Sequence, residues 1–330
     1  MSVDIVTTHK IFPQTRAILR AGGTVRSPQG DSFADVELAA ALADAVAVMA
    51  FMPDRVDTSF LRAAPHLSIV AAALKGYDNI DVEACSIRGV WVSIVPDLLT
   101  APTAELTIGL LIGLARHLRE ADLYVRSGDF RGWTPRFYGV SLENSTVGII
   151  GMGAVGCAVV KRLAAFDCRI LYFDKRAECV KMTPSGESRP LNALLAESDM
   201  VVLCIPLSAS TVHFINADRL ALMKRGALLV NPARGSLIDE KAVAAALAEG
   251  HLAGYAADAF ELEDLSRADR PRDIPAALLA HPHTLFGAHI GSATIAARQA
   301  IEARAAENIL DALTGHVPRD AINTISQRTP

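Results

Sequence analysis

The stretch of chain from residue 146 to residue 174 constrains the possible folds most strongly. An apolar, β-branched run at residues 146–150 leads into a Gly-x-Gly-x-x-Gly motif at residues 151–156, and a helical pattern follows directly. A second apolar run then ends in Asp174. A strand, a glycine-rich turn, a helix and a second strand ending in an acid form the order that a dinucleotide site requires in a parallel α/β sheet.

Each glycine of this motif has a physical task at such a site. Gly151 permits the tight turn, Gly153 lets the backbone approach a pyrophosphate, and Gly156 lets helix and strand pack closely. The helix start offers free N–H groups and a partial positive charge to the pyrophosphate. Asp174 can accept hydrogen bonds from the adenosine ribose. The competing interpretation is an ordinary glycine turn, but the flanking strand, helix and acid favour a nicotinamide or flavin site.

Length and composition set the class of protein. A chain of 330 residues, 51% hydrophobic and 21% charged, can fill the cores of about two domains. The net charge of −4 gives no reason to expect binding to nucleic acid or an acidic membrane. The longest apolar run, at residues 106–115, is too short to span a bilayer, and the acid near the N-terminus argues against a signal peptide. The five cysteines show neither a CxxC motif nor metal-ligand spacing, so we expect buried free thiols, no metal and a cytoplasmic protein.

The chain alternates strand-like and helical segments along most of its length. This alternation predicts parallel sheets with helices on their faces. We expect strands at residues 3–7, 45–51, 67–72, 90–94, 200–205, 227–231 and 254–258. We expect helices at residues 12–21, 33–43, 58–63, 82–88, 239–249 and 293–313.

Residues 104–126 are expected to form one long helix. Its first half is apolar almost all round, which indicates burial between domains or subunits. Residues 127–145 follow as a Gly/Pro/aromatic-rich loop. That loop is either a surface connection or a segment that lines a site through Trp133 and Tyr138.

Three polar residues follow strand-like runs, where α/β enzymes place their sites. Arg234 could hold an oxyanion with two parallel hydrogen bonds. His289 can take up a proton near neutral pH, and the carboxylate of Glu263 could orient its ring. Taken singly, the three residues could also be a loop salt bridge, a solvated acid and a satisfied histidine. Their order beside a dinucleotide motif makes the set specific.

These motifs together resemble the D-2-hydroxyacid dehydrogenases over nearly the whole chain. The resemblance rests on the glycine motif, Asn231-x-x-Arg-Gly235, the Glu263 that follows Asp258-Ala-Phe260, and His289-Ile-Gly-Ser292. It implies two Rossmann-like or flavodoxin-like doubly wound parallel-sheet domains in a homodimer. The NAD-binding domain (100–292) would be inserted into a substrate (catalytic) domain (1–99 plus 293–330). Arg234 would bind the substrate anion, and Glu263 and His289 would form the acid/base pair. The implied cofactor contacts are Thr103, Gly151, Gly153, Ala154, Val155, Gly156, Asp174, Lys175, Arg176, Pro206 and Asp258.

Five further segments are similar to phosphite (phosphonate) dehydrogenases within that family. They are residues 49–54, 73–79, 95–100, 131–139 and 268–271. This resemblance implies oxidation of phosphite to phosphate, with hydride transfer to NAD(P)+. The implied substrate-binding residues are Met52, Lys75, Gly76, Trp133, Tyr138, Arg234 and Arg298.

Lys75 gives a physical reason for that narrower interpretation. Phosphite near neutral pH is largely a dianion, so a second cation beside an arginine is useful, whereas a monoanionic hydroxy acid needs it less. Lys75 could instead be a surface lysine before a turn. The alternative functions are a D-2-hydroxyacid dehydrogenase or glyoxylate/hydroxypyruvate reductase, and a non-catalytic NAD-sensing protein.

The sequence departs from the family pattern before the predicted catalytic histidine. Family members usually read Thr-Pro where this chain has Gly287-Ala288, so a looser turn is expected. Asp174 favours NAD, whereas Lys175 and Arg176 could neutralise its charge, so we expect NAD with appreciable NADP use. We expect His281-Pro-His283 to be a turn and not a metal site.

Overall fold

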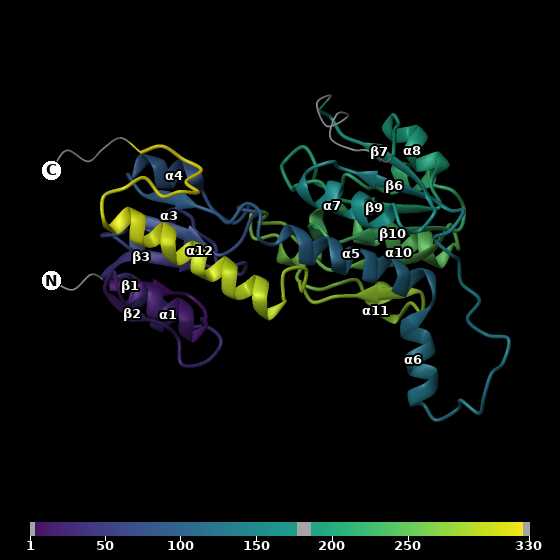
Figure 1. Cartoon of the computed structure of the whole chain (residues 1–330), viewed down its shortest axis with the longest axis horizontal. Helices are drawn as coiled ribbons and strands as arrows, with labels where there is room; N and C mark the ends of the chain where they lie inside the picture. Colours follow the sequence, from purple (N-terminus) through teal and green to yellow (C-terminus); the bar gives the residue numbers. More distant parts are fainter. Residues whose placement is uncertain (1–3, 177–185, 326–330) are drawn as a thin grey trace. The chain divides into compact units, whose positions relative to one another are not determined.

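The computed structural model describes residues 4–176 and 186–325 (Figure 1). The chain divides into two compact units. Unit 1 comprises residues 1–99 and 293–330, and unit 2 comprises residues 100–292. No helix among the described residues is long and apolar enough to cross a membrane.

Unit 1 contains a five-stranded sheet in which every neighbouring pair of strands is parallel. The strand order is β2-β1-β3-β4-β5, which is the flavodoxin-like order. The strands are β1 (Asp4–Thr7), β2 (Thr24–Arg26), β3 (Ala45–Ala50), β4 (Ile69–Ala72) and β5 (Trp91–Ser93). The helices are α1 (Pro13–Leu19), α2 (Asp35–Leu42), α3 (Thr58–Ala63), α4 (Val82–Ile87) and α12 (Ile295–Leu313).

Helices cover both faces of this sheet because its central strands are apolar on both sides. Every residue of β4 is buried, and separate hydrophobic clusters lie on the two faces. One cluster includes side chains of α1 and α12, which lie side by side (Figure 1). Glu302 on α12 accepts hydrogen bonds from the Phe12 backbone N–H (3.0 Å) and the Thr15 hydroxyl (3.1 Å), and this joins the two helices.

Unit 2 contains a seven-stranded sheet in which all neighbouring strands are again parallel. Its strand order, β12-β11-β10-β9-β6-β7-β8, is the Rossmann order with one further strand. The strands are β6 (Thr146–Ile150), β7 (Arg169–Phe173), β8 (Glu187–Ser188), β9 (Met200–Leu203), β10 (Ala227–Asn231), β11 (Leu252–Ala257) and β12 (Thr284–Phe286). The helices are α5 (Thr100–Ala115), α6 (Leu118–Arg126), α7 (Ala154–Leu163), α8 (Leu191–Glu197), α9 (Ala217–Ala221), α10 (Glu240–Ala248) and α11 (Ala276–Ala280), with short 3-10 helices η2 (Gly235–Leu237) and η3 (Glu261–Glu263).

Two hydrophobic clusters cover the two faces of the unit 2 sheet, one with side chains of α5 and α7 and the other with side chains of α8 and α10. The predicted fold class is therefore confirmed: both sheets are parallel and doubly wound.

The described cysteines, Cys85, Cys157, Cys168 and Cys204, form no disulfide. Cys179 lies outside the described residues.

The single helix expected at residues 104–126 is wrong. The structure has two helices, α5 and α6, that meet at His117 (Figure 1). His117 adopts a left-handed backbone conformation with a φ of 53°, which a continuing right-handed helix cannot accommodate. The hydrophobic pattern continues through the corner, so periodicity alone gave no signal of the break.

Candidate active site

The glycine motif forms the expected turn between β6 and α7. Gly151 has a φ of +101°, and a Cβ there would lie 2.6 Å from the Cys204 carbonyl oxygen. A Cβ on Gly156 would lie 2.0 Å from the Gly151 carbonyl oxygen. At Gly153, the residue before α7, the nearest atom to such a Cβ would be the Arg176 guanidinium at 3.9 Å. The turn therefore leaves open space at the start of a ten-residue helix, as a bound pyrophosphate requires.

Asp174 follows β7 at the same edge of the sheet. Its carboxylate accepts hydrogen bonds from the Met152 N–H at 2.7 Å and from the backbone N–H and guanidinium of Arg176. Burial alone would raise the pKa of Asp174, but the bonds from Arg176 and Met152 outweigh it and lower this pKa to about 2. Asp174 is therefore a permanent anion with Arg176 beside it. Lys175 is exposed next to the pair.

The predicted acid/base residues follow three adjacent strands. Arg234 lies beyond β10, Glu263 beyond β11 and His289 beyond β12. Because these strands are parallel neighbours, the loops that carry the three residues leave the sheet at one edge.

Two contacts fix the loop that carries Arg234. The Asn231 amide donates to the Arg234 carbonyl oxygen at 2.8 Å, and its side-chain oxygen accepts from the Ala233 N–H at 3.1 Å. A Cβ on Gly235 would lie 1.8 Å from the Phe260 carbonyl carbon. The loop after β10 therefore approaches the loop after β11 backbone to backbone, which only glycine permits.

The structure joins Glu263 and His289 directly. The His289 Nδ1 atom lies 2.5 Å from Glu263 Oε2. The other carboxylate oxygen of Glu263 accepts from the Phe260 N–H at 2.7 Å, so the acid is fixed by the backbone. Both side chains are about 30% exposed, at 28% for His289 and 31% for Glu263. This pairing leaves the His289 Nε2 atom as the nitrogen available for proton transfer to a ligand.

Asp258 holds the turn that contains His289. Its buried carboxylate accepts from the Ile290 N–H at 2.9 Å and from the Gly291 N–H at 2.7 Å. Burial raises the pKa of Asp258, and these two bonds oppose the rise. A Cβ on Gly287 would lie 2.1 Å from Asp258 Oδ1, so glycine gives the carboxylate room to reach the turn. Hydrogen bonds thus hold the turn that the missing proline was expected to loosen.

Unit 1 carries four of the predicted substrate-binding residues: Met52, Lys75, Gly76 and Arg298. Lys75 and Gly76 follow β4, and Met52 follows β3. Arg298 on α12 donates to the Ala73 carbonyl oxygen at 3.2 Å, so a guanidinium lies just before Lys75 at the end of β4. Burial lowers the pKa of Lys75, while Asp97 opposes that shift.

Among the predicted pocket residues, Trp133 and Tyr138 are highly exposed to solvent. Their exposed fractions are 82% and 74%. In one chain they therefore form no buried wall, and their role in a pocket stays a prediction.

The remaining predicted cofactor residues all lie in unit 2. Ala154 and Val155 begin α7, and Pro206 follows β9. Thr103, in the first turn of α5, lies close to Gly291: a Cβ on that glycine would be 3.3 Å from the Thr103 hydroxyl. Sequence reasoning missed one buried pair in unit 2, Glu240 and Glu261. Each carboxylate accepts a hydrogen bond from the other residue's backbone N–H, at 2.8 and 3.2 Å, and no sequence pattern signals this contact.

Comparison with known proteins agrees with this geometry. Residues 108–291 match the family model of the D-isomer specific 2-hydroxyacid dehydrogenase NAD binding domain. The glyoxylate reductase of Pyrococcus horikoshii is 39% identical over 283 residues, which is 84% of this chain and 82% of that protein.

Solved structures extend the similarity to the whole chain. The TT0316 protein from Thermus thermophilus aligns with a TM-score of 0.88 and 34% identity, covering 97% of this chain and all of that one. The NADPH-dependent glyoxylate/hydroxypyruvate reductase SmGhrB from Sinorhizobium meliloti, solved with NADP and malonate, aligns with a TM-score of 0.84 and 28% identity over the full length of both chains. The chain therefore belongs to the D-isomer specific 2-hydroxyacid dehydrogenase family of oxidoreductases and carries its NAD-binding domain.

Proposed function

We propose that the protein transfers a hydride between a nicotinamide cofactor and a small anionic substrate. The observation that carries this proposal is the 2.5 Å contact between Glu263 and His289, on the same sheet edge as the loop of Arg234. Unit 2 would hold the cofactor and unit 1 would be the substrate domain. The bound nicotinamide would accept or give the hydride.

The residues of this site would divide the work. Arg234 would hold the substrate anion by its planar fork of N–H donors. Glu263 would keep the His289 ring in one orientation, so that Nε2 can give a proton to the substrate or take one from it. Asp258 would keep His289 in place through the turn.

A 2-oxo acid or 2-hydroxy acid is the first substrate candidate. The names of the relatives favour this activity over phosphite oxidation, since they are glyoxylate reductases and a glyoxylate/hydroxypyruvate reductase. In the reducing direction Arg234 would bind the carboxylate. His289 would protonate the carbonyl oxygen as the carbon gains hydride.

Phosphite is the second candidate, and one specific observation favours it. Lys75 and the Arg298 guanidinium both lie at the end of β4, so unit 1 offers two cations there. Two cations suit a dianion with three oxygens better than a monoanion. In that reaction His289 would take a proton from the water that attacks phosphorus, and hydride would leave phosphorus as phosphate forms.

The cofactor of this proposal is NAD, with NADP also accepted. Asp174 would bind the ribose hydroxyls of NAD and repel a 2′-phosphate. The Arg176 guanidinium on that carboxylate, with Lys175 beside it, would reduce the repulsion. The bound NADP of the Sinorhizobium relative is consistent with both cofactors in this family.

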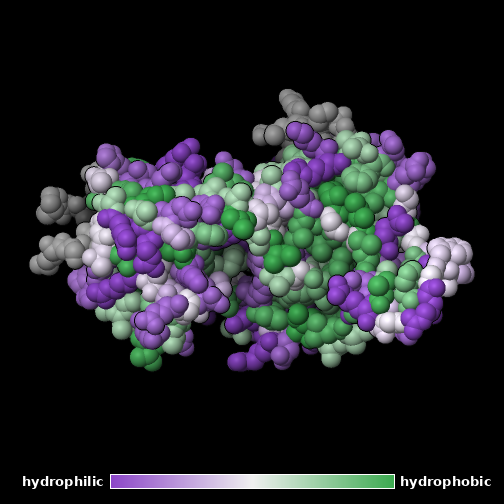
Figure 2. All heavy atoms as spheres, turned by 60° about the horizontal axis from the view of Figure 1, so that its bottom comes forward, coloured by the Kyte–Doolittle hydropathy of each residue, from purple (hydrophilic) through white to green (hydrophobic). Residues whose placement is uncertain are grey.

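A homodimer is also part of this proposal. Hydrophobic side chains gather over one face of unit 2 in Figure 2. α6 has no buried residue, and large apolar side chains on α6 and in residues 127–145 are exposed. They are Leu118, Leu123, Val125, Phe130, Trp133, Phe137, Tyr138 and Val140. An apolar surface of this kind is typical of a protein–protein interface, and a second copy of this chain would cover it.

A cofactor absorbance assay with a panel of substrates tests the function. The purified protein is given glyoxylate or hydroxypyruvate with NADH, and glycerate, lactate or phosphite with NAD. Turnover with the organic acids alone selects the first candidate, and phosphite-dependent NADH with phosphate released one for one selects the second. The His289→Ala variant should lose most turnover and keep NADH binding. Near-normal turnover of this variant would contradict the proposed role of His289.

A further inference from the structure

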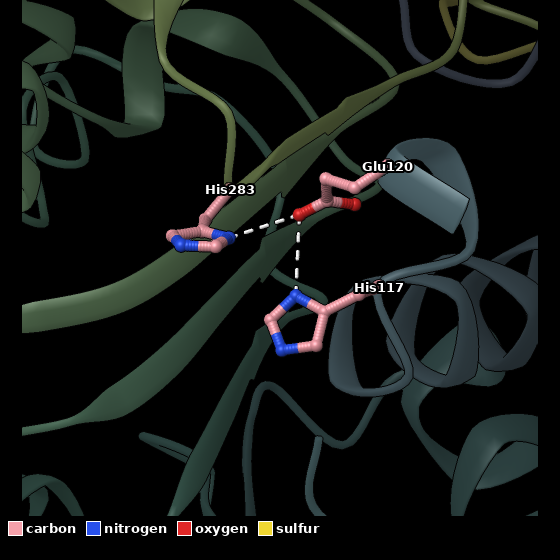
Figure 3. A group of neighbouring side chains, drawn as sticks. All are labelled: His117, Glu120 and His283. Atoms are coloured by element: carbon pink, nitrogen blue, oxygen red, sulfur yellow. Dashed lines mark hydrogen bonds and ion pairs between the residues drawn. The ribbon is translucent and has the colours of Figure 1, made fainter. Parts of the chain in front are cut away.

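Three potential metal ligands meet at the corner between α5 and α6 (Figure 3). They are His117, Glu120 and His283. Both imidazole rings point a nitrogen at the same carboxylate oxygen of Glu120. The hydride-transfer reaction proposed above uses none of these residues.

The backbone brings these residues together from distant parts of the chain. His117 is the N-cap residue of α6, two residues after the end of α5, and Glu120 lies in the first turn of α6. His283 lies in the turn just before β12. Arg119 joins these segments independently of the ligands, because its guanidinium donates to the carbonyl oxygens of His281, Pro282 and Thr284 at 3.2 to 3.3 Å.

The distances fit one small cation. The Glu120 Oε1 atom lies 3.2 Å from His117 Nδ1 and 2.9 Å from His283 Nδ1. All three ligand atoms lie within 4.8 Å of one another. With metal–ligand bonds of about 2.0 to 2.1 Å, two ligands of a tetrahedral ion are about 3.3 Å apart. The two distances to Glu120 Oε1 are already within about 0.4 Å of that spacing.

The chemistry of the ligands selects the class of ion. Two imidazoles and one carboxylate suit borderline ions such as Zn²⁺, whereas Mg²⁺ and Ca²⁺ prefer oxygen ligands only. The Glu120 side chain is 16% exposed and that of His283 is 45% exposed, so an ion can enter and a water can complete its coordination. His281 is not a ligand through Nδ1, because that nitrogen accepts a hydrogen bond from the His283 N–H at 3.2 Å.

A hydrogen-bonded network is the alternative arrangement of the same atoms. In it each Nδ1 carries a proton and donates to Glu120. In this form both imidazole rings bond to the same oxygen, Glu120 Oε1, at 3.2 and 2.9 Å. An ion would replace the two Nδ1 protons and keep the same three side chains and the same anion.

We propose that His117, Glu120 and His283 form a binding site for one divalent transition-metal ion, with Zn²⁺ as the best fit. The bound ion would tie α6 to the turn before β12. It would thereby brace the helix from which residues 127–145 extend. Among residues 4–176 and 186–325, this is the group whose ligand atoms come close enough to hold an ion.

Calorimetric titration with ZnCl₂ after treatment with EDTA tests the site. The wild-type protein should bind one Zn²⁺ per chain. Each of the variants His117→Ala, Glu120→Gln and His283→Ala should weaken that affinity at least about tenfold. His281→Ala and His66→Ala are matched controls and should bind as the wild type does, because His281 is a neighbour outside the triangle and His66 is an exposed histidine of unit 1.

A second measurement keeps the test informative if an alanine variant unfolds. Glu120→Gln retains shape and removes only the charge, and circular dichroism checks its fold. With Co²⁺ as the probe, the wild type should show the strong visible absorption of a four-coordinate ion, and Glu120→Gln should lose it. The proposal is overturned if the wild type binds no Zn²⁺, or if folded Glu120→Gln binds both ions as the wild type does. Equal weakening by His281→Ala or His66→Ala would also overturn it.

Discussion

Replacing Gly287 by alanine should damage the catalytic turn, although an added methyl group is the smallest possible change. The new Cβ would lie 2.1 Å from Asp258 Oδ1, where ordinary contact begins near 3.4 Å. The carboxylate must therefore move by about 1.3 Å. It is 1% exposed and holds two backbone N–H groups at 2.9 and 2.7 Å, so it cannot move without breaking at least one bond.

The size of the effect follows from those two bonds. A hydrogen bond to a charged group contributes about 1.5–3 kcal/mol, so the free energy of unfolding of unit 2 should fall by roughly 2–4 kcal/mol. For a unit of this size the melting temperature should drop by roughly 5–15 °C. A displacement of His289 of about 1 Å would also lower kcat by up to about 100-fold.

Thermal melting followed by circular dichroism and steady-state kinetics check both numbers. Ala288→Ser is the control, because Ala288 is the exposed neighbour of Gly287. If Gly287→Ala melts within about 1 °C of the wild type and keeps its turnover, the reasoning from Asp258 is refuted.

Three other variants address the substrate, the cofactor and pH. Lys75→Met should reduce kcat/KM about 100-fold for a dianion such as phosphite and far less for glyoxylate, because one of two cations at the end of β4 is lost. Equal reductions of kcat/KM for the two substrates would contradict this. The Lys175→Ala/Arg176→Ala double variant should lower kcat/KM for NADP but not for NAD, and equal NADP use in both proteins would show that these cations are irrelevant. Burial, together with the charges of Glu261 and other nearby acids, raises the pKa of Glu240 from 4.5 to about 7. Between these two pH values the folded protein binds a proton that the unfolded chain has lost, so the free energy of unfolding falls as the pH rises from 4.5 to 7. Glu240→Gln should remove this loss and stabilise unit 2 by about 1–3 kcal/mol at pH 8 in urea unfolding, while an unchanged pH dependence would count against it.

The sequence predicts the nucleotide-binding part of the fold well because its signals are local. Gly151 needs a φ of +101° and Gly156 lies against the Gly151 carbonyl oxygen, and both requirements arise within one strand–turn–helix unit, so the spacing of these glycines carries the geometry. The strand at residues 227–231 has the predicted bounds because its apolar run is short and sharply ended. Arg234, Glu263 and His289 follow three strand ends that parallel topology must bring to one edge.

Long-range contacts account for what the sequence does not predict. The short edge strand β2 (Thr24–Arg26) has no buried residue and hence no hydrophobic pattern to detect. The sequence alone does not explain why position 287 is glycine. The reason is the Asp258 carboxylate, which the fold places against this position. Similarly, His283 is an ordinary turn histidine until α6 places Glu120 beside it, 163 positions away in the chain.

The two units can complete their hydrophobic cores at different times during synthesis of the chain. Unit 2 is one continuous segment, so its core closes as soon as that segment has left the ribosome. Unit 1 needs α12: Glu302 bonds to Phe12, 290 positions earlier, and the apolar side chains of α12 complete one face of the first sheet. At about 5–20 residues per second, the first strands wait for roughly 15–60 s. During that time their apolar face is open to chaperones and to other chains, so the nascent first sheet is exposed to aggregation until α12 has been made.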